Sequence, residues 1–191
     1  AGSFLADGNT DEHVAGIEAA KNLKQEFFTI PWIEENLRRD IESYKKIASR
    51  LNEAGKLCRN AGLKLAYHNH DFEFQKKAGK TGFEILLKET DENLVDFELD
   101  LYWVVFSRND PFKLFKENPG RFKIWHVKDM DKMNRSLNTE VGSGTLDFKA
   151  IFKEVKLSGM QYFFVEQENN FALNSFESVK TSCDFISKNI I

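Results

Sequence analysis

The chain has 191 residues, 41% of them hydrophobic, and a formal net charge of −3. These values fit one soluble globular domain with a sizeable core, and the near balance of 27 basic and 30 acidic residues argues against a nucleic-acid-binding surface. No stretch is apolar enough to span a bilayer and no signal peptide is recognisable, so we expect the cytoplasm, or the periplasm if an export signal has been removed.

Helical and extended patterns alternate along the chain. Helices are predicted at about 11–24, 36–61, 81–89, from 110 onward, 147–156 and 175–188. Extended segments are predicted at 26–30, 63–70, 94–100, 122–128 and 162–168. This alternation predicts βαβ units and a parallel sheet, in a single α/β domain covering residues 1–191. The two cysteines, Cys58 and Cys183, fall in helical segments and are expected to be core thiols without a disulfide.

Ionisable side chains gather at the ends of four predicted strands. Because side chains alternate along a strand, the residues that share a face are His68 with His70, Glu98 with Asp100, His126 with Lys128, and Glu166 with Glu168. A sheet covered by helices on both sides has no room for these groups, whereas the inner face of a closed barrel opens at its top. One such strand end is usually a cap or a surface group, but four in succession predict a convergent site.

The composition of this site favours a metal. Carboxylates and imidazoles form a mixed oxygen and nitrogen set, which suits Mn²⁺, Zn²⁺, Co²⁺ or Fe²⁺ better than Ca²⁺. The run Gly142-Ser143-Gly144 is a weaker signal, which leaves a phosphate-binding loop and an ordinary connection both open.

Five motifs occur in a fixed order along the chain. They are Tyr67-His68-Asn69-His70-Asp71-Phe72-Glu73-Phe74, Asp100-Leu101-Tyr102-Trp103, His126-Val127-Lys128-Asp129, Glu140-Val141-Gly142-Ser143-Gly144 and Val165-Glu166-Gln167. Together they resemble the xylose-isomerase-like TIM-barrel superfamily, in its sugar phosphate isomerase/epimerase branch, near inosose dehydratases and ketose epimerases. The resemblance covers the chain from about Gly16 to its end.

This resemblance implies a (β/α)8 TIM barrel. Such barrels have eight strands and typically about 250 residues. Five strands are predicted here, so we expect the N-terminal strands to be missing and the chain to be about the C-terminal two-thirds of a barrel. Residues 1–5 are then the tail of an earlier strand.

The resemblance also implies a divalent metal (Mn²⁺, Zn²⁺, Co²⁺ or Mg²⁺) held by His68, Asp100, His126 and Glu166. A glutamate is commoner at the position of His68, so the two-glutamate form of epimerisation is in doubt. The expected function is a metal-dependent isomerase or epimerase that moves a proton next to the carbonyl of a sugar, sugar phosphate or polyol derivative. A dehydratase or lyase acting on a keto-sugar or inosose and a non-catalytic sugar-binding relative are the alternatives. The superfamily's apurinic-site endonucleases fit the acidic charge and four histidines poorly.

Roles for single residues follow from this reaction. Glu166 is the expected base, with His68, His70 or Glu73 as the opposite acid or base. Lys128 is expected to donate to a developing oxyanion, or to pair with Asp100 or Glu98 instead. The expected substrate-binding residues are Trp32, Asn69, Tyr102, Trp103 and Glu140, although a solvent-exposed Glu140 is an equal alternative. Trp125 has the opposite strand phase to His126 and is predicted to lie in the core. The expected partner is a small carbohydrate, without nucleic acid or membrane, and a homo-oligomer is left open.

Overall fold

The computed structural model describes residues 11–191, with side chains from residue 14 onward. The strand tail predicted at residues 1–5 lies outside the described residues. The chain forms two compact units, Ala1–Glu98 and Leu99–Ile191. Within residues 11–191, no helix is long and apolar enough to cross a membrane.

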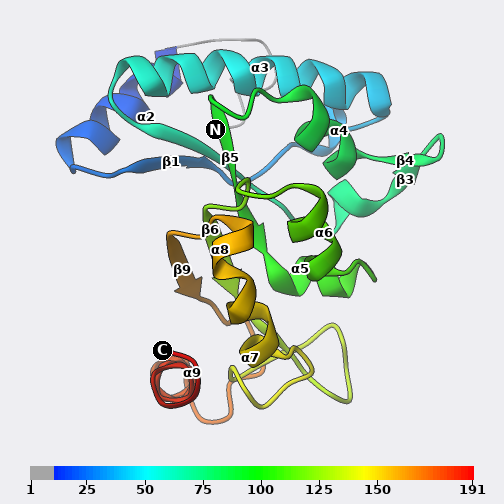
Figure 1. The fold of residues 1–191 in the computed structure, drawn as a ribbon, viewed down its shortest axis with the longest axis vertical. Coiled ribbons are helices and arrows are strands. Elements are labelled where there is room, and N and C mark those ends of the chain that lie inside the picture. Colours follow the sequence, from blue (N-terminus) through cyan, green and yellow to red (C-terminus); the bar gives the residue numbers. More distant parts are fainter. Residues whose placement is uncertain (1–10) are drawn as a thin grey trace. The chain divides into compact units, whose positions relative to one another are not determined.

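Helices and strands alternate in both units (Figure 1). The first unit contains α2 (Asp11–Asn22), β1 (Phe27–Ile30), the 3-10 turn η1 (Glu35–Leu37), α3 (Ile41–Asn60), β2 (Lys64–His68), η2 (Phe72–Phe74), β3 (Lys76–Lys77), β4 (Lys80–Thr81), α4 (Gly82–Glu89) and most of β5 (Val95–Asp100). The second contains the end of β5, then α5 (Leu101–Phe106), α6 (Pro111–Glu117), β6 (Ile124–Val127), β7 (Asp129–Met130), β8 (Asn138–Thr139), α7 (Phe148–Ile151), η3 (Phe152–Glu154), α8 (Val155–Ser158), β9 (Tyr162–Val165) and α9 (Ser175–Asn189).

The main strands are parallel, as predicted. The strand order is β1-β2-β5 in the first unit, and β6 lies beside β9 in the second. The pairs β1–β2, β2–β5 and β6–β9 are all parallel. The five predicted extended segments are therefore confirmed, and two short antiparallel pairs, β3–β4 and β7–β8, are additional.

Helix α3 packs the first unit together. It begins at Ile41 and not near residue 36, because the Asp40 carboxylate caps it by accepting the Ser43 N–H at 2.7 Å. Its buried stripe faces β2 and α4. A Cβ atom on Gly55 would lie 2.5 Å from the Leu94 carbonyl oxygen, so the glycine permits this close packing.

An aromatic core holds the second unit. Trp125 is fully buried, as predicted, and stacks on Phe115 with ring centroids 5.2 Å apart. The helix predicted at 147–156 is broken into α7, η3 and α8, and α5 was not predicted. Cys58 is a buried free thiol as expected, but the prediction for Cys183 was wrong, because this free thiol on α9 is exposed.

Candidate functional site

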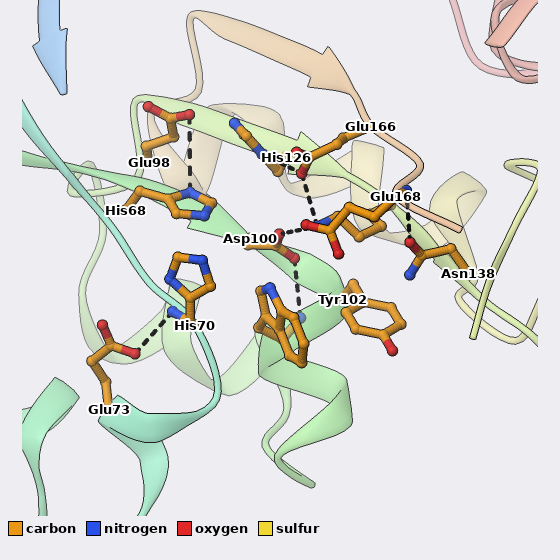
Figure 2. A network of polar contacts seen from close by, with 12 residues as sticks. His68, His70, Glu73, Glu98, Asp100, Tyr102, His126, Asn138, Glu166 and Glu168 are labelled. Carbon is orange, nitrogen blue, oxygen red and sulfur yellow. Dashed lines mark hydrogen bonds and ion pairs between the residues drawn. The ribbon is translucent and has the colours of Figure 1, made fainter. Parts of the chain in front are cut away.

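Lys128 is the centre of a buried ion cluster in the second unit. It directly follows β6, and its side chain is 1% exposed. Its Nζ atom lies 3.3 Å from Asp100 Oδ2, 2.8 Å from Glu166 Oε2 and 3.0 Å from Glu168 Oε1. Figure 2 shows these three carboxylates gathered together. Burial lowers the pKa of Lys128, but Asp100 and Glu166 outweigh this and raise that pKa, so the side chain is a cation. The single positive charge of Lys128 balances one of the three carboxylate charges, so two negative charges remain.

Asp100 owes its position to the turn from β5 into α5. It is the last residue of the strand and the N-cap of the helix, and its Oδ1 accepts the Trp103 N–H at 3.0 Å. Its side chain is fully buried. Burial raises the pKa of Asp100 to about 6, against the opposing effect of Lys128. The pair between Lys128 and Asp100, left open by the sequence, is therefore present.

His126 lies in β6, and Glu166 directly follows the strand β9 that pairs with it. His126 Nδ1 lies 2.8 Å from Glu166 Oε2 (Figure 2). This bond is the main reason why the pKa of Glu166 falls to about 2, with Lys128 adding to the effect. One ligand atom of His126 and one of Asp100 lie within 4.8 Å of each other. Asp100 and His126, two of the predicted metal ligands, thus lie close together in this unit. Glu166, a third predicted ligand, is hydrogen-bonded to His126.

Hydrogen bonds to Asn138 connect the loop after β9 to β8. The buried Asn138 side chain accepts the Glu168 N–H through Oδ1 at 2.9 Å, and the Asn138 backbone N–H donates to Asn169 Oδ1 at 2.8 Å. Asn170 Nδ2 donates to the Asn138 carbonyl at 2.9 Å. These bonds fix the segment that carries Glu166 and Glu168.

Glu140 is buried, so the solvent-exposed alternative was wrong. Its Oε1 accepts the Ala172 N–H at 3.0 Å and the hydroxyl of Ser178 on α9. Burial raises the pKa of Glu140, but the bonds from Ser178 and Ala172 outweigh it and lower that pKa to about 2. Glu140 joins its loop to α9, and its contact with substrate stays a prediction.

The Gly142–Gly144 loop is organised by a buried carboxylate. Asp129 Oδ2 accepts the N–H groups of Gly142 at 3.0 Å and Gly144 at 3.1 Å, and Oδ1 accepts that of Leu146 at 3.1 Å. A Cβ atom on Gly144 would lie 2.3 Å from Asp129 Oδ1. The glycine amides thus point into the protein, which favours the ordinary connection over the phosphate-binding loop.

His68 ends β2 in the first unit. In the parallel register it lies opposite Glu98, and its Nδ1 is 3.9 Å from Glu98 Oε1 (Figure 2). Glu98 Oε2 accepts the Thr29 hydroxyl at 2.7 Å. Three neighbouring strands therefore fix this buried imidazole and its carboxylate neighbour.

His70 lies beyond the end of β2, so its position depends on a turn and not on strand alternation. Glu73 makes that turn: it is fully buried and accepts the His70 N–H at 2.8 Å and the Tyr67 hydroxyl. Burial raises the pKa of Glu73 to about 7, although the Tyr67 bond opposes the rise. The His70 ring contacts Trp32 edge-on, with centroids 4.8 Å apart, and stacks on Phe72.

The predicted sugar-binding residues differ in exposure. Trp32 is 39% exposed, whereas Asn69 and Tyr102 are buried. The Tyr102 hydroxyl donates to the Arg135 carbonyl at 2.8 Å. Lys128 Nζ lies 5.8 Å from the Tyr102 ring centroid and 5.7 Å from that of Trp103, so both rings pack around the ion cluster.

A model of the family described as xylose isomerase-like TIM barrel matches residues 9–189. The chain belongs to the xylose isomerase-like TIM barrel family. Its parallel strands and alternating helices are those of a TIM barrel, as the sequence predicted.

Curated and solved members of this TIM barrel family are similar to the chain. An inosose dehydratase of Clostridium perfringens is 31% identical over 151 residues, which is 69% of this chain and 50% of that protein. A sugar phosphate isomerase/epimerase of Parabacteroides distasonis is 28% identical with a TM-score of 0.79, over 95% of this chain and 65% of the other. The IolI protein with a bound zinc atom has a TM-score of 0.70 at 19% identity, over 94% of this chain and 69% of the other, and so shares the fold. The chain spans about half the length of the curated relatives it matches.

Several residues that shape the site have no role predicted from the sequence. Glu168 has the same strand phase as Glu166, and this pattern could have predicted that Glu168 joins the ion cluster. Asp129 and Asn138 gave no such signal, because their bonds reach loops that only the folded chain brings close.

Proposed function

We propose that the protein is a metal-dependent enzyme that moves a proton next to the carbonyl of a sugar, sugar phosphate or polyol derivative. The observation that carries this proposal is the ion cluster, in which Lys128 faces Asp100, Glu166 and Glu168. The excess of two negative charges suits a divalent cation. The printed names of the relatives, inosose dehydratase and sugar phosphate isomerase/epimerase, support a carbohydrate substrate.

The proposed metal ligands are His68, Asp100, His126 and Glu166. The chemistry of the donors fits, because Asp100 and His126 offer an oxygen and a nitrogen within 4.8 Å and Glu166 is held ionised. When bound, the cation would polarise the substrate carbonyl and a neighbouring hydroxyl. Zn²⁺, Mn²⁺, Co²⁺ and Mg²⁺ are the proposed candidates, and the zinc of the IolI structure puts Zn²⁺ first.

Proton transfer is assigned to His70, with Glu166 as the second candidate. With a pKa of about 2, Glu166 suits ligation better than proton abstraction. His70 is partly exposed and held between Trp32 and Phe72, while Glu73 fixes its backbone. Glu73 itself is fully buried and acts as a positioning residue. Trp32 offers an apolar face to a sugar ring.

Dehydration is the second candidate reaction. Loss of water needs one base and stabilisation of the departing hydroxyl, and the buried Lys128 ammonium offers a fixed positive charge for this. The curated relatives called inosose dehydratase favour this outcome. Isomerisation or epimerisation would instead return the proton to carbon.

The test is incubation of the metal-loaded protein in D₂O with a ketohexose, a ketohexose phosphate and an inosose. Deuterium next to the carbonyl of a recovered or isomerised sugar supports isomerisation, and loss of one water by mass spectrometry supports dehydration. We expect His70→Ala to slow the reaction by at least about 100-fold, with Glu53→Gln on the exposed face of α3 as the control. Sugar binding without exchange or water loss for any probe would contradict the proposal and support the non-catalytic alternative.

A further inference from the structure

A basic pocket lies in the first unit, and its Arg38 packs on Phe72 and Trp32, the two rings that contact His70. A surface pocket of about 610 Å³ is lined by Glu35, Asn36, Arg38, Arg39, Gln75 and Lys77. A second pocket of about 380 Å³ shares Asn36 and Arg39 with it and adds Asp40, Lys46 and Arg50 among its lining residues. We call the two together the arginine pocket. It has five basic side chains against two acidic ones, in a chain whose formal net charge is −3.

Two of the basic side chains are held in place. Arg38 lies 3.6 Å from the centroid of the Phe72 ring, and its Nε donates to the Ile33 carbonyl at 3.0 Å. Its terminal Nη groups have no hydrogen-bond partner among residues 14–191. Lys77 Nζ donates to the Arg39 carbonyl at 3.0 Å, which ties the β3–β4 hairpin to the start of α3. A guanidinium with a fixed plane loses little freedom when it binds a ligand.

The acidic side chains do not neutralise the pocket. The Asp40 carboxylate caps α3 by accepting the backbone N–H and the hydroxyl of Ser43. The hydrogen bond from the Ser43 N–H lowers the pKa of Asp40, and the positive charges of Lys46 and Lys77 lower it further. Glu35 alone opposes Arg38, Arg39 and Lys77 in the larger pocket.

We propose that the arginine pocket binds a phosphate monoester, with Arg38, Arg39 and Lys77 contacting its oxygens. A phosphate group matches these three side chains, because one guanidinium can donate two hydrogen bonds to two phosphate oxygens, and the lysine ammonium adds a positive charge. The phosphate has two sources: the substrate itself, or a separate phosphorylated small molecule that binds beside the reaction site. The proposal does not depend on the reaction proposed above.

Binding of inorganic phosphate, followed by ¹H–¹⁵N NMR, tests the site without any turnover. We expect saturable shifts of the Asn36, Arg39, Gln75 and Lys77 amides that potassium chloride of equal ionic strength does not produce. The double variant Arg39→Gln/Lys77→Gln should weaken binding at least about tenfold. Lys153→Gln/Lys156→Gln removes two exposed charges from the second unit and is the matched control. Unchanged affinity in the Arg39/Lys77 variant, or shifts equal to those with chloride, would overturn the proposal.

A ketohexose phosphate and the same sugar without phosphate separate the two sources. If the substrate carries the phosphate, the Arg39/Lys77 variant raises KM for the phosphorylated sugar alone. If the phosphate belongs to a separate molecule, inorganic phosphate changes turnover of the unphosphorylated sugar without competing with it. Both outcomes support the site. An absence of turnover leaves the NMR result standing, so failure of the reaction and failure of the site are distinguishable.

Discussion

Oε2 of Glu166 lies 2.8 Å from Lys128 Nζ and also 2.8 Å from His126 Nδ1. One carboxylate oxygen thus serves two nitrogen partners. This explains the low pKa of Glu166, because both partners favour its charged form. It follows that a cation bound by this oxygen competes directly with Lys128.

Replacing Lys128 by methionine should destabilise the metal-free protein. Asp100 is fully buried, and removal of its cationic partner leaves an uncompensated charge, which costs about 3–5 kcal/mol of the free energy of unfolding. Because the competing ammonium is gone, added Zn²⁺ or Mn²⁺ should raise the melting temperature of Lys128→Met more than that of the wild type.

Lys132→Met, an exposed change, is the control for this comparison. Lys128→Arg keeps the charge and should retain most of the stability, which covers the case in which Lys128→Met fails to fold. Equal metal responses in the wild type and Lys128→Met would show that Lys128 does not compete for the site.

Stability should fall as the pH rises through the titration range of Glu73. Its folded pKa is about 7 and its ordinary value is 4.5, so the folded state holds a proton that the unfolded state has lost between these values. The contribution is fully present below about pH 4.5 and gone above about pH 7, with an upper bound of about 3 kcal/mol. Asp100 acts with the same sign between 3.8 and about 6.

Urea unfolding at several pH values checks this prediction. Glu73→Gln keeps an acceptor for the Tyr67 hydroxyl and removes the titration, so the free energy of unfolding should fall less with rising pH than in the wild type. Glu53→Gln should leave the wild-type slope unchanged. A Glu73→Gln slope equal to that of the wild type would contradict the assigned pKa.

Asn138→Ala should loosen the loop that carries Glu166 and Glu168. The change leaves the Glu168 N–H without its acceptor, at a cost of about 1–3 kcal/mol. Metal affinity, measured by calorimetry, should weaken by about 10–100-fold, as is usual when a group that supports the ligands is lost. Asn134→Ala removes a comparable acceptor in an exposed turn and should change affinity little. Retained metal affinity in Asn138→Ala would show that the loop positions itself without this residue.

Gly144→Ala should disrupt the loop that Asp129 organises. The added methyl group would lie 2.3 Å from both Asp129 Oδ1 and the Met130 carbonyl, so these groups must move and the carboxylate loses N–H donors. We expect a loss of about 1–3 kcal/mol in thermal unfolding. Ser143→Ala, at the neighbouring exposed position, should be nearly neutral. Equal melting temperatures for the two variants would contradict the described packing.

The strands were predictable because their signal is local. Alternating apolar residues in Val95–Asp100, and the polar groups at its end, identify a strand and the place where it stops. Helix α5 was not predictable in this way, since Leu101–Phe106 is an aromatic and β-branched run of weak helix propensity. Its capping by Asp100 becomes visible only in the fold.

The site was predictable as a group of residues but not as a set of contacts. Strand phase placed His126 with Lys128 and Glu166 with Glu168, yet their pairing depends on the β6–β9 register, in which Val127 lies opposite Val165. His70 lies two residues beyond the end of β2, where its backbone N–H bonds to Glu73, yet its ring centroid is 4.8 Å from that of His68, so the two imidazoles lie together as strand phase predicts.

The two cysteines differ in chemical reactivity. Cys58 is buried in α3, and burial raises its thiol pKa to about 12, whereas Cys183 is exposed on α9. A thiolate-directed reagent will therefore react with Cys183 and spare Cys58. A fluorescent or spin label can thus be attached at one position on α9 in the natural sequence, without engineering a cysteine.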